Sequence, residues 1–158
     1  MTDFGCYGAD LMTWLMRGER PTSVFAVTQR IKPDVYPKVE DEATIVVTYP
    51  KAQGIIQASW NWPFNRKDFE VYTERSYAVA TGGDLLKVRL PDQKAEEART
   101  LAELPADQRD SISYLTAVVR GKLKSSGLNS LENNVVVVEI LDAARESVKT
   151  GKTVTLSR

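Results

Sequence analysis

The alternation of apolar and polar residues divides the chain into helical and extended segments. Within residues 6–16 the apolar side chains gather on one side of a helical projection, and Gly18 follows as the expected helix end. We expect one helix here, with Thr2 or Asp3 as its N-cap. The period then changes to two, which is typical of β-strands. The predicted strands cover residues 23–31, 44–49, 54–62, 69–80, 85–90 and 153–156.

Short polar connections indicate how these strands pair. Residues 50–54 and 81–84 each have the length of a hairpin turn, which joins antiparallel strands, whereas a parallel pair needs a longer crossover. The sheet is therefore expected to be mainly antiparallel. Residues 91–105 are charged and carry a proline at each end, which predicts an exposed excursion with room for a short helix.

Two further helical patterns occupy the last third of the chain. After capping candidates at 110–111, apolar residues repeat at helical spacing over 112–123. Asn129 and Glu132 have capping-box spacing ahead of a longer pattern, which Gly151 is expected to end. The patterns together predict an α+β fold, in which a mixed, mostly antiparallel sheet is covered on one face by the first and last helices. The other face is left open for a partner.

Composition and charge narrow the classes of protein that fit this pattern. The chain has 158 residues, of which 42% are hydrophobic and 27% charged, a balance typical of one soluble globular domain. Its 21 basic and 21 acidic residues cancel, and no stretch concentrates one sign, so we expect neither a nucleic-acid nor a membrane partner. The first 16 residues are too short and polar for a membrane span or secretory signal, which favours a cytoplasmic protein.

The chemistry available to the chain is limited by two residue types. Cys6 is its one cysteine, which excludes an internal disulfide and any multi-thiolate metal site, and it fits a reducing compartment. Histidine is absent, which removes the commonest metal ligand and the commonest general base at neutral pH. Zinc hydrolases and Ser-His-Asp hydrolases are therefore excluded, and any acid–base chemistry must use carboxylates, tyrosine or lysine.

The candidate chemistry lies in the first predicted helix. Asp3, Tyr7 and Asp10 are four and three residues apart and so line one stripe of that helix. A carboxylate and a phenol on one face can together grip a polyol and exchange a proton with it. The alternative is structural: Asp3 as an N-cap, Tyr7 as a half-buried aromatic at the rim and Asp10 as a solvated charge.

Aromatic and basic residues after the third predicted strand allow two interpretations. Trp60 and Trp62 fall on one face of that strand, where flat rings suit the stacking of a sugar, but packing under the helices or against a partner sheet is the commoner role of such aromatics. Arg66 and Lys67 lie just beyond and are within reach of a polar substrate, or are simply solvated.

Several motifs in order along the chain resemble one family. The stretch DFGCYGADL at 3–11, followed by Trp14-Leu15 and Gly18, resembles the D-x-G-x-[HY]-x-x-D segment that opens the substrate domain of the Gfo/Idh/MocA oxidoreductases. The similarity extends over essentially all 158 residues. Its further elements are the strand start at 21–24, the S-W pair Ser59-Trp60, the helix start at 129–133 and the S-x-x-x-G-[KR] pattern at 147–152.

The resemblance implies roles for particular residues. In this family the aspartate matched by Asp3 helps to hold the substrate, and the residue matched by Tyr7 exchanges a proton with the reacting hydroxyl. In having a tyrosine at this position, the chain is similar to the glucose–fructose oxidoreductase branch of the family. The substrate implied is a sugar or cyclitol, oxidised at a CH–OH group with NAD or NADP, and Asp10 and Arg66 are further candidates for contact with it. One departure is the segment 70–76, which replaces the family's usual E-x-x-G-x-x-G.

The resemblance also implies what these 158 residues do not contain. They have no G-x-G-x-x-G turn and no E-K-P motif, the family's source of a cation beside the proton-exchanging residue. We therefore expect residues 1–158 to be a single substrate-binding and oligomerisation domain, with the N-terminal Rossmann domain absent and neither NAD nor NADP bound by this chain alone. A homo-dimer or tetramer through the open sheet face is expected. The rival hypothesis is a non-catalytic binding or assembly module that keeps the same sheet.

Overall fold

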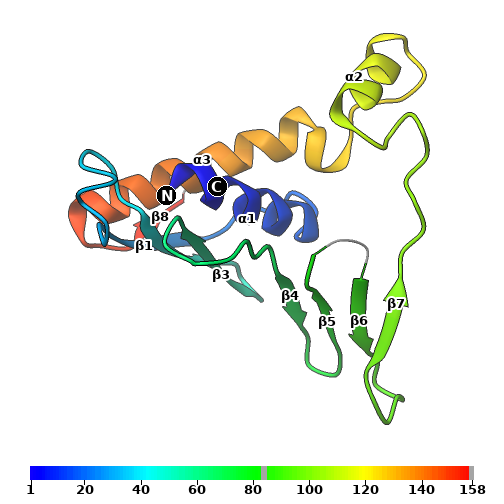
Figure 1. The fold of residues 1–158 in the computed structure, drawn as a ribbon, viewed down its shortest axis with the longest axis horizontal. Coiled ribbons are helices and arrows are strands. Elements are labelled where there is room, and N and C mark those ends of the chain that lie inside the picture. Colours follow the sequence, from blue (N-terminus) through cyan, green and yellow to red (C-terminus); the bar gives the residue numbers. More distant parts are fainter. Residues whose placement is uncertain (83–84, 157–158) are drawn as a thin grey trace. The chain divides into compact units, whose positions relative to one another are not determined.

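The computed structural model describes residues 1–82 and 85–156, which form two compact units (Figure 1). The first unit comprises Met1–Trp62 and the chain from Ser125 onward, and the second comprises Pro63–Lys124. The elements of the first unit are α1 (Thr2–Leu15), β1 (Ser23–Gln29), β2 (Glu42–Thr48), β3 (Gln53–Ser59), the 3-10 turn η1 (Gly127–Asn129), α3 (Leu131–Thr150) and β8 (Val154–Thr155).

The first unit is a four-stranded sheet with two helices on one face. The strands run in the order β3-β2-β1-β8, and each neighbouring pair is antiparallel. Alternate residues of β2 are buried, as the period of two predicts, and Ile45 lies opposite Ala26 of β1 and Ile56 of β3. Helices α1 and α3 cover this buried face with Ala9 and Ile140, among others (Figure 1). The core of the unit therefore lies between this face and the two helices.

Helix α1 approaches β3 unusually closely, because two glycines face the helix–sheet contact. A Cβ atom on Gly8 would stand 2.5 Å from Cγ2 of Ile56, and a Cβ on Gly54 would stand 2.5 Å from Cε of Met12. Real Cβ atoms do not come so near to other heavy atoms, so neither position has room for a side chain without displacement of its neighbour. The missing side chains set the height of α1 above the sheet.

A buried hydroxyl joins α3 to β1. Among the described residues, strand β8 pairs with Ser23 and Val24 of β1, and no strand lies beside the outer edge of β1 beyond that point. There the Oγ of Ser147, a fully buried residue of α3, accepts a hydrogen bond of 3.0 Å from the backbone N–H of Ala26. Ser147 thus takes the place of a strand neighbour for Ala26, which gives the first residue of the S-x-x-x-G-[KR] pattern a structural role.

One core residue carries a polar atom without a partner. Tyr49 follows β2 and is 3% exposed, and among the described residues nothing hydrogen-bonds its hydroxyl. Burial, aided by the nearby charge of Glu19, raises the pKa of Tyr49 to about 12. The neutral phenol is therefore the form that the core accommodates.

Three of the observed helix caps differ from the predicted ones. Helix α1 begins at Thr2 with Met1 as its N-cap and no side-chain capping bond, so Thr2 and Asp3 both lie within the helix. At its C-terminus Arg17, rather than Gly18, is the first left-handed residue (φ 55°), and Gly18 N–H closes the turn on the Thr13 carbonyl.

The N-terminus of α3 differs from the prediction by one residue. The N-cap is Ser130, whose Oγ accepts from the N–H of Asn133, so the predicted box between Asn129 and Glu132 is shifted by one position. At the other end Gly151 adopts the left-handed conformation and ends the helix, as predicted.

The second unit contains another antiparallel sheet and one helix. Its elements are β4 (Phe69–Tyr72), β5 (Tyr77–Ala80), β6 (Leu85–Arg89), β7 (Glu97–Thr100) and α2 (Ser111–Val119), and the strand order is β4-β5-β6-β7. The N-cap of α2 is Asp110, which accepts from the N–H groups of Ile112 and Ser113, as predicted. Of the predicted turn at 81–84, residues Gly83 and Asp84 lie outside the described residues.

Two predicted segments of the second unit were wrong in their element type. The single strand expected over 69–80 is a hairpin, because Thr73 accepts from the N–H of Ser76 and closes a tight turn between β4 and β5. The excursion at 91–105 is exposed, as expected, but it contains the edge strand β7 rather than a helix. A fully exposed edge strand lacks the apolar alternation that reveals a strand in the sequence.

The predicted α+β class is confirmed, and the strands form two antiparallel sheets rather than one mixed sheet.

The sheet face of the first unit that points away from the helices carries apolar side chains at three register-matched positions. Phe25 lies opposite Val46, which lies opposite Ile55, and Ile55 is 66% exposed. None of the described helices has both the length and the apolar character needed to cross a membrane.

Candidate functional site

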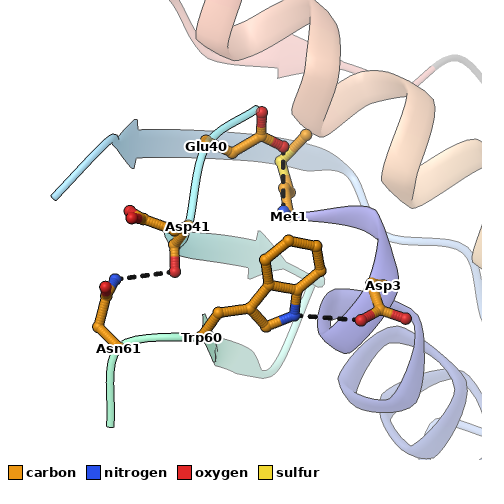
Figure 2. A network of polar contacts seen from close by, with 6 residues as sticks. All are labelled: Met1, Asp3, Glu40, Asp41, Trp60 and Asn61. Atoms are coloured by element: carbon orange, nitrogen blue, oxygen red, sulfur yellow. Dashed lines mark hydrogen bonds and ion pairs between the residues drawn. The ribbon is translucent and has the colours of Figure 1, made fainter. Parts of the chain in front are cut away.

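The first turn of α1 is joined to the end of β3 by a hydrogen bond between two side chains. The indole Nε1–H of Trp60 donates to Oδ2 of Asp3 over 3.1 Å, as Figure 2 shows. Trp60 is held from other directions as well: its backbone N–H donates to the Asp41 carbonyl at 2.8 Å, and its ring lies 4.9 Å from that of Tyr36 and edge-on to Phe4. Trp60 is therefore held in a fixed position from which its indole reaches Asp3.

Asp41 holds the backbone around Trp60 in place. It is 2% exposed, and its two carboxylate oxygens accept from the backbone N–H groups of Ile31 and Lys32 at 2.8 and 2.7 Å. Its carbonyl accepts from Nδ2 of Asn61 at 2.9 Å (Figure 2). Burial alone would raise the pKa of Asp41, but the hydrogen bonds to its carboxylate outweigh burial and hold that pKa below its ordinary value. Asp41 thus ties the β1–β2 loop to the residues that follow β3.

A second polar group extends this network along the end of β3. The Ser59 hydroxyl donates to Glu42, and Ser59 Oγ accepts from the N–H of Asn61 at 3.0 Å. Asn61 Nδ2 also lies 3.2 Å from the Glu42 carboxylate. The backbone after β3 is therefore fixed on both sides of Trp60, which limits how far the indole can move from Asp3.

Tyr7 lies one helical turn after Asp3 on the same face of α1. It is 55% exposed, and its ring centroid lies 6.4 Å from that of Phe4. A residue and its fourth successor are neighbours on a helix surface, so the phenol and the carboxylate are adjacent on the exposed side of α1. The structure therefore brings together the two residues that the resemblance places at the reacting centre.

Asp10 and Arg66 lie in other surroundings. Asp10 is half-buried and accepts from Nδ2 of Asn133, which ties α1 to the first turn of α3; burial raises the pKa of Asp10, and this hydrogen bond only partly offsets the rise. Arg66 belongs to the second unit, where it forms an ion pair with Asp68. The assignment of both residues to substrate binding stays a prediction.

A small cavity lies beside Trp60 in the first unit. The cavity there has a volume of about 10 Å³ and is lined by Met1, Phe4, Glu40, Asp41, Ala58 and Trp60. That volume admits about one water molecule and no sugar. Asp3 and Tyr7 do not line this cavity and are both exposed, so a molecule held by them would rest on the outer face of α1.

Neither a metal ion nor a dinucleotide fits the residues at hand. Among the described residues there is no cluster of three or more cysteine, aspartate or glutamate side chains that would hold a metal ion. A dinucleotide site needs a strand, a glycine-rich turn and a helix in succession within a parallel sheet. The strand pairs described in this chain are antiparallel, and its sequence has no G-x-G-x-x-G. The residues around Asp3 and Tyr7 therefore provide carboxylate and phenol groups but no nucleotide-binding turn.

Comparison with known families decides the assignment of the fold. The family model described as the GFO/IDH/MocA C-terminal domain matches residues 1–79, which include α1, the sheet of the first unit as far as β3, and the site around Asp3 and Trp60. The chain belongs to this family. The resemblance in the first helix and the S-W pair is therefore confirmed. No curated protein matches the chain in a comparison of sequences.

Solved structures of oxidoreductases share the fold of this family member. The aldose-aldose oxidoreductase from Caulobacter crescentus, complexed with glycerol, is 20% identical, with a TM-score of 0.77 over 98% of this chain and 46% of that one. A putative oxidoreductase from Thermotoga maritima is 18% identical, with a TM-score of 0.78 over 96% and 45%. A putative myo-inositol dehydrogenase from Sinorhizobium meliloti is 17% identical, with a TM-score of 0.65 over 98% and 49%. The chain spans about half the length of these proteins.

Sequence reasoning missed the residues that support Asp3. Trp60 was weighed for sugar stacking or packing, yet its observed polar contact is with an aspartate 57 positions away, which no local spacing reveals. Asp41 gave no signal, because its carboxylate is satisfied by backbone N–H groups that any sequence would provide. The S-W resemblance was the one available indication that the residue after Ser59 has a particular task.

Proposed function

We propose that this chain is the substrate-binding and oligomerisation domain of an NAD(P)-dependent oxidoreductase that acts on a CH–OH group of a sugar or cyclitol. The observation that carries the proposal is the pair of Asp3 and Tyr7 on the exposed face of α1, with Asp3 held by Trp60. The family membership supports an oxidoreductase domain, and the fold neighbours support the class of reaction.

In this proposal the two residues have different tasks. The Asp3 carboxylate accepts hydrogen bonds from substrate hydroxyls; its Oδ2 is already directed by Trp60, which leaves Oδ1 and the remaining lone pairs for the substrate. The Tyr7 hydroxyl exchanges the proton of the reacting hydroxyl as a general acid or base. Their spacing of one helical turn, about 5.4 Å along the axis, would let both side chains reach hydroxyls of one polyol.

The cofactor belongs to another part of the protein in this proposal. The residues of this chain do not fit a dinucleotide, and the chain spans about half the length of its fold neighbours, one of which is GenD2 in complex with NAD. A nucleotide-binding domain would hold NAD or NADP, which accepts or donates the hydride when bound. That domain would also supply a second surface that encloses a substrate on α1 and a cation beside Tyr7.

The proposal is tested with a protein in which this chain is joined to its nucleotide domain. Absorbance at the nicotinamide band should change when NAD or NADP is offered together with one of a panel of aldoses and cyclitols. Calorimetry with residues 1–158 alone should show no binding of NAD or NADP. A joined protein that turns over no polyol while it binds NAD tightly would leave the non-catalytic alternative in place.

A specific observation favours an assembly role alongside catalysis. Phe25, Val46 and Ile55 form an apolar row across three strands on the sheet face that the helices leave uncovered. Exposed apolar rows of this kind on soluble proteins mark interaction surfaces. We infer that a second copy covers this face, giving a dimer or, with a further interface, a tetramer.

A further inference from the structure

A groove lies between the end of α1 and the start of α3, on the first unit. Its volume is about 320 Å³, which is at the lower end of the range for small-molecule sites. Trp14 and Asp3 are 11 positions apart on α1, so the groove lies about 16 Å along the helix axis from the Asp3 carboxylate. It is lined by Trp14, Arg17, Gly127, Ser130, Glu132 and Asn133, together with Gly18.

One wall of the groove is aromatic. Trp14 is 49% exposed, an unusual amount of free surface for the largest apolar side chain. The backbone of η1 closes on one edge of its ring: a Cβ on Gly127 would stand 3.7 Å from both Cδ1 and Nε1 of Trp14. The indole is therefore steadied at that edge, and it offers the groove a flat apolar surface.

The polar residues that line the groove are of two kinds: two are held by hydrogen bonds, and two are charged and lack an ion pair. Ser130 and Asn133 are engaged in the cap of α3 and in the bond to Asp10, so they form a rigid wall. Arg17 and Glu132 line the groove with opposite charges, and neither takes part in an ion pair among the described residues. The groove is thus lined by the guanidinium donors of Arg17, which follows α1, by the carboxylate acceptors of Glu132 on α3, and by the aromatic surface of Trp14.

This arrangement discriminates between classes of ligand. An anion would be attracted by Arg17 and repelled by Glu132, and a cation would experience the reverse, so neither gains from the pair as a whole. A hydroxyl group both donates and accepts and can therefore satisfy both residues at once. A ring with an apolar C–H face would also cover the indole. We propose that the groove binds a neutral polyhydroxylated molecule of monosaccharide size, stacked on Trp14 with its hydroxyls shared between Arg17 and Glu132.

Fluorine NMR of the chain labelled with 5-fluorotryptophan tests this site directly. Each of the three tryptophans gives one resonance, assigned with Trp14→Phe, Trp60→Phe and Trp62→Phe, and D-glucose or myo-inositol is titrated in. The Trp14 resonance should shift saturably with a Kd of about 1–10 mM, a range typical of a small solvent-exposed site, while those of Trp60 and Trp62 stay unchanged. The readout requires no enzyme activity and so does not depend on the proposed function.

Variants then assign the contacts. Arg17→Gln and Glu132→Gln should each weaken binding about tenfold, as expected for a lost hydrogen bond to a charged group, whereas Glu146→Gln on an exposed part of α3 should leave it unchanged. Trp14→Ala should abolish binding, and Trp14→Phe should retain part of it. If Trp14→Ala fails to fold by circular dichroism, the two charge variants still decide.

Three outcomes would overturn the inference. The first is the absence of any saturable shift at Trp14. The second is a shift at Trp60 or Trp62 in place of Trp14, which would put the polyol at the Asp3 end of the helix. The third is tighter binding of inorganic phosphate or of glycine than of glucose, which would make the ligand an anion or a zwitterion.

Discussion

The hydroxyl of Ser147 accepts a hydrogen bond of 3.0 Å from the backbone N–H of Ala26. Ser147 is fully buried, and the two residues are 121 positions apart in the sequence. Ser147→Ala removes the acceptor and leaves a buried N–H without a partner, so the free energy of unfolding should fall by about 1–3 kcal/mol. The control is Thr13→Val, because the Thr13 hydroxyl donates to an Ala9 carbonyl that keeps its helical hydrogen bond. Urea unfolding measures both, and equal losses in the two variants would contradict the assigned role of Ser147.

The close contact of α1 with β3 gives a second prediction. Gly8→Ala pushes a Cβ into the branched side chain of Ile56, so overpacking should cost about 1–3 kcal/mol. Gly54→Ala meets the flexible end of Met12, which can turn aside, and should cost less than about 1 kcal/mol. Chemical denaturation of the matched pair checks this order. A smaller loss for Gly8→Ala than for Gly54→Ala would mean that the helix can rise from the sheet freely.

Tyr49 predicts a dependence of stability on alkaline pH. An unfolded tyrosine ionises near pH 10, whereas in the fold the pKa of Tyr49 is raised to about 12. Between these values the unfolded state has lost a proton that the folded state retains, so stability should fall as the pH rises from about 10 to 12. Tyr49→Phe should remove this part of the slope. It should also raise stability at neutral pH by about 1 kcal/mol, because the buried hydroxyl lacks a protein partner. A loss of stability at pH 7 would reveal a hydrogen bond to bound water.

Kinetic measurements distinguish the roles of Tyr7 and Asp3 in the protein that also carries a nucleotide domain. Tyr7→Phe removes a proton relay but little volume, so kcat should fall about 10²- to 10⁴-fold with the fold unchanged. Asp3→Asn keeps an acceptor for Trp60 but loses the charge, and it should raise KM and lower kcat together. Tyr72→Phe, at an exposed tyrosine of the second unit, serves as the control. Kinetics close to wild type in both site variants would leave the domain as a scaffold.

The uncovered sheet face predicts the assembly state. Ile55→Glu places a charge in the apolar row and should convert a dimer into a monomer, or a tetramer into a dimer held by the other interface, without unfolding the chain, since Ile55 is exposed in the single chain. Ile31→Glu, at an exposed isoleucine in the β1–β2 loop, should leave assembly unchanged. Light scattering at high micromolar concentration distinguishes the outcomes. A monomeric wild-type chain would remove the basis for this interface.

The sequence predicted those parts of the fold that local periodicity determines. The alternation in β2 and β3 and the positive-φ glycine at 151 appear where the pattern placed them. Edge strand β7 and the break between β4 and β5 were missed, because an exposed strand carries no apolar alternation and the turn after Tyr72 has no glycine or proline to mark it. Both caps of α1 and the N-cap of α3 lie one or two residues from their predicted positions, since several neighbouring residues were competent to cap.

The candidate site could be predicted only in its local part. Asp3 and Tyr7 share a helix face because of their spacing, which the sequence contains directly. The contacts of Asp3 with Trp60 and of Asp41 with the loop N–H groups depend on how β3 ends beside α1, and that relationship arises from the packing of the whole unit. Such contacts become visible only in three dimensions.

The two glycines between α1 and β3 also bear on how this domain diversifies. The depth at which the helix settles is determined by its inner side, through Gly8, and by the strand beneath it, through Gly54. Its outer side, which carries positions 3 and 7, has no part in that packing. Substitutions at the outer positions therefore leave the depth of the helix unchanged, so the chemistry displayed on this helix can change without any change in the glycine contacts beneath it.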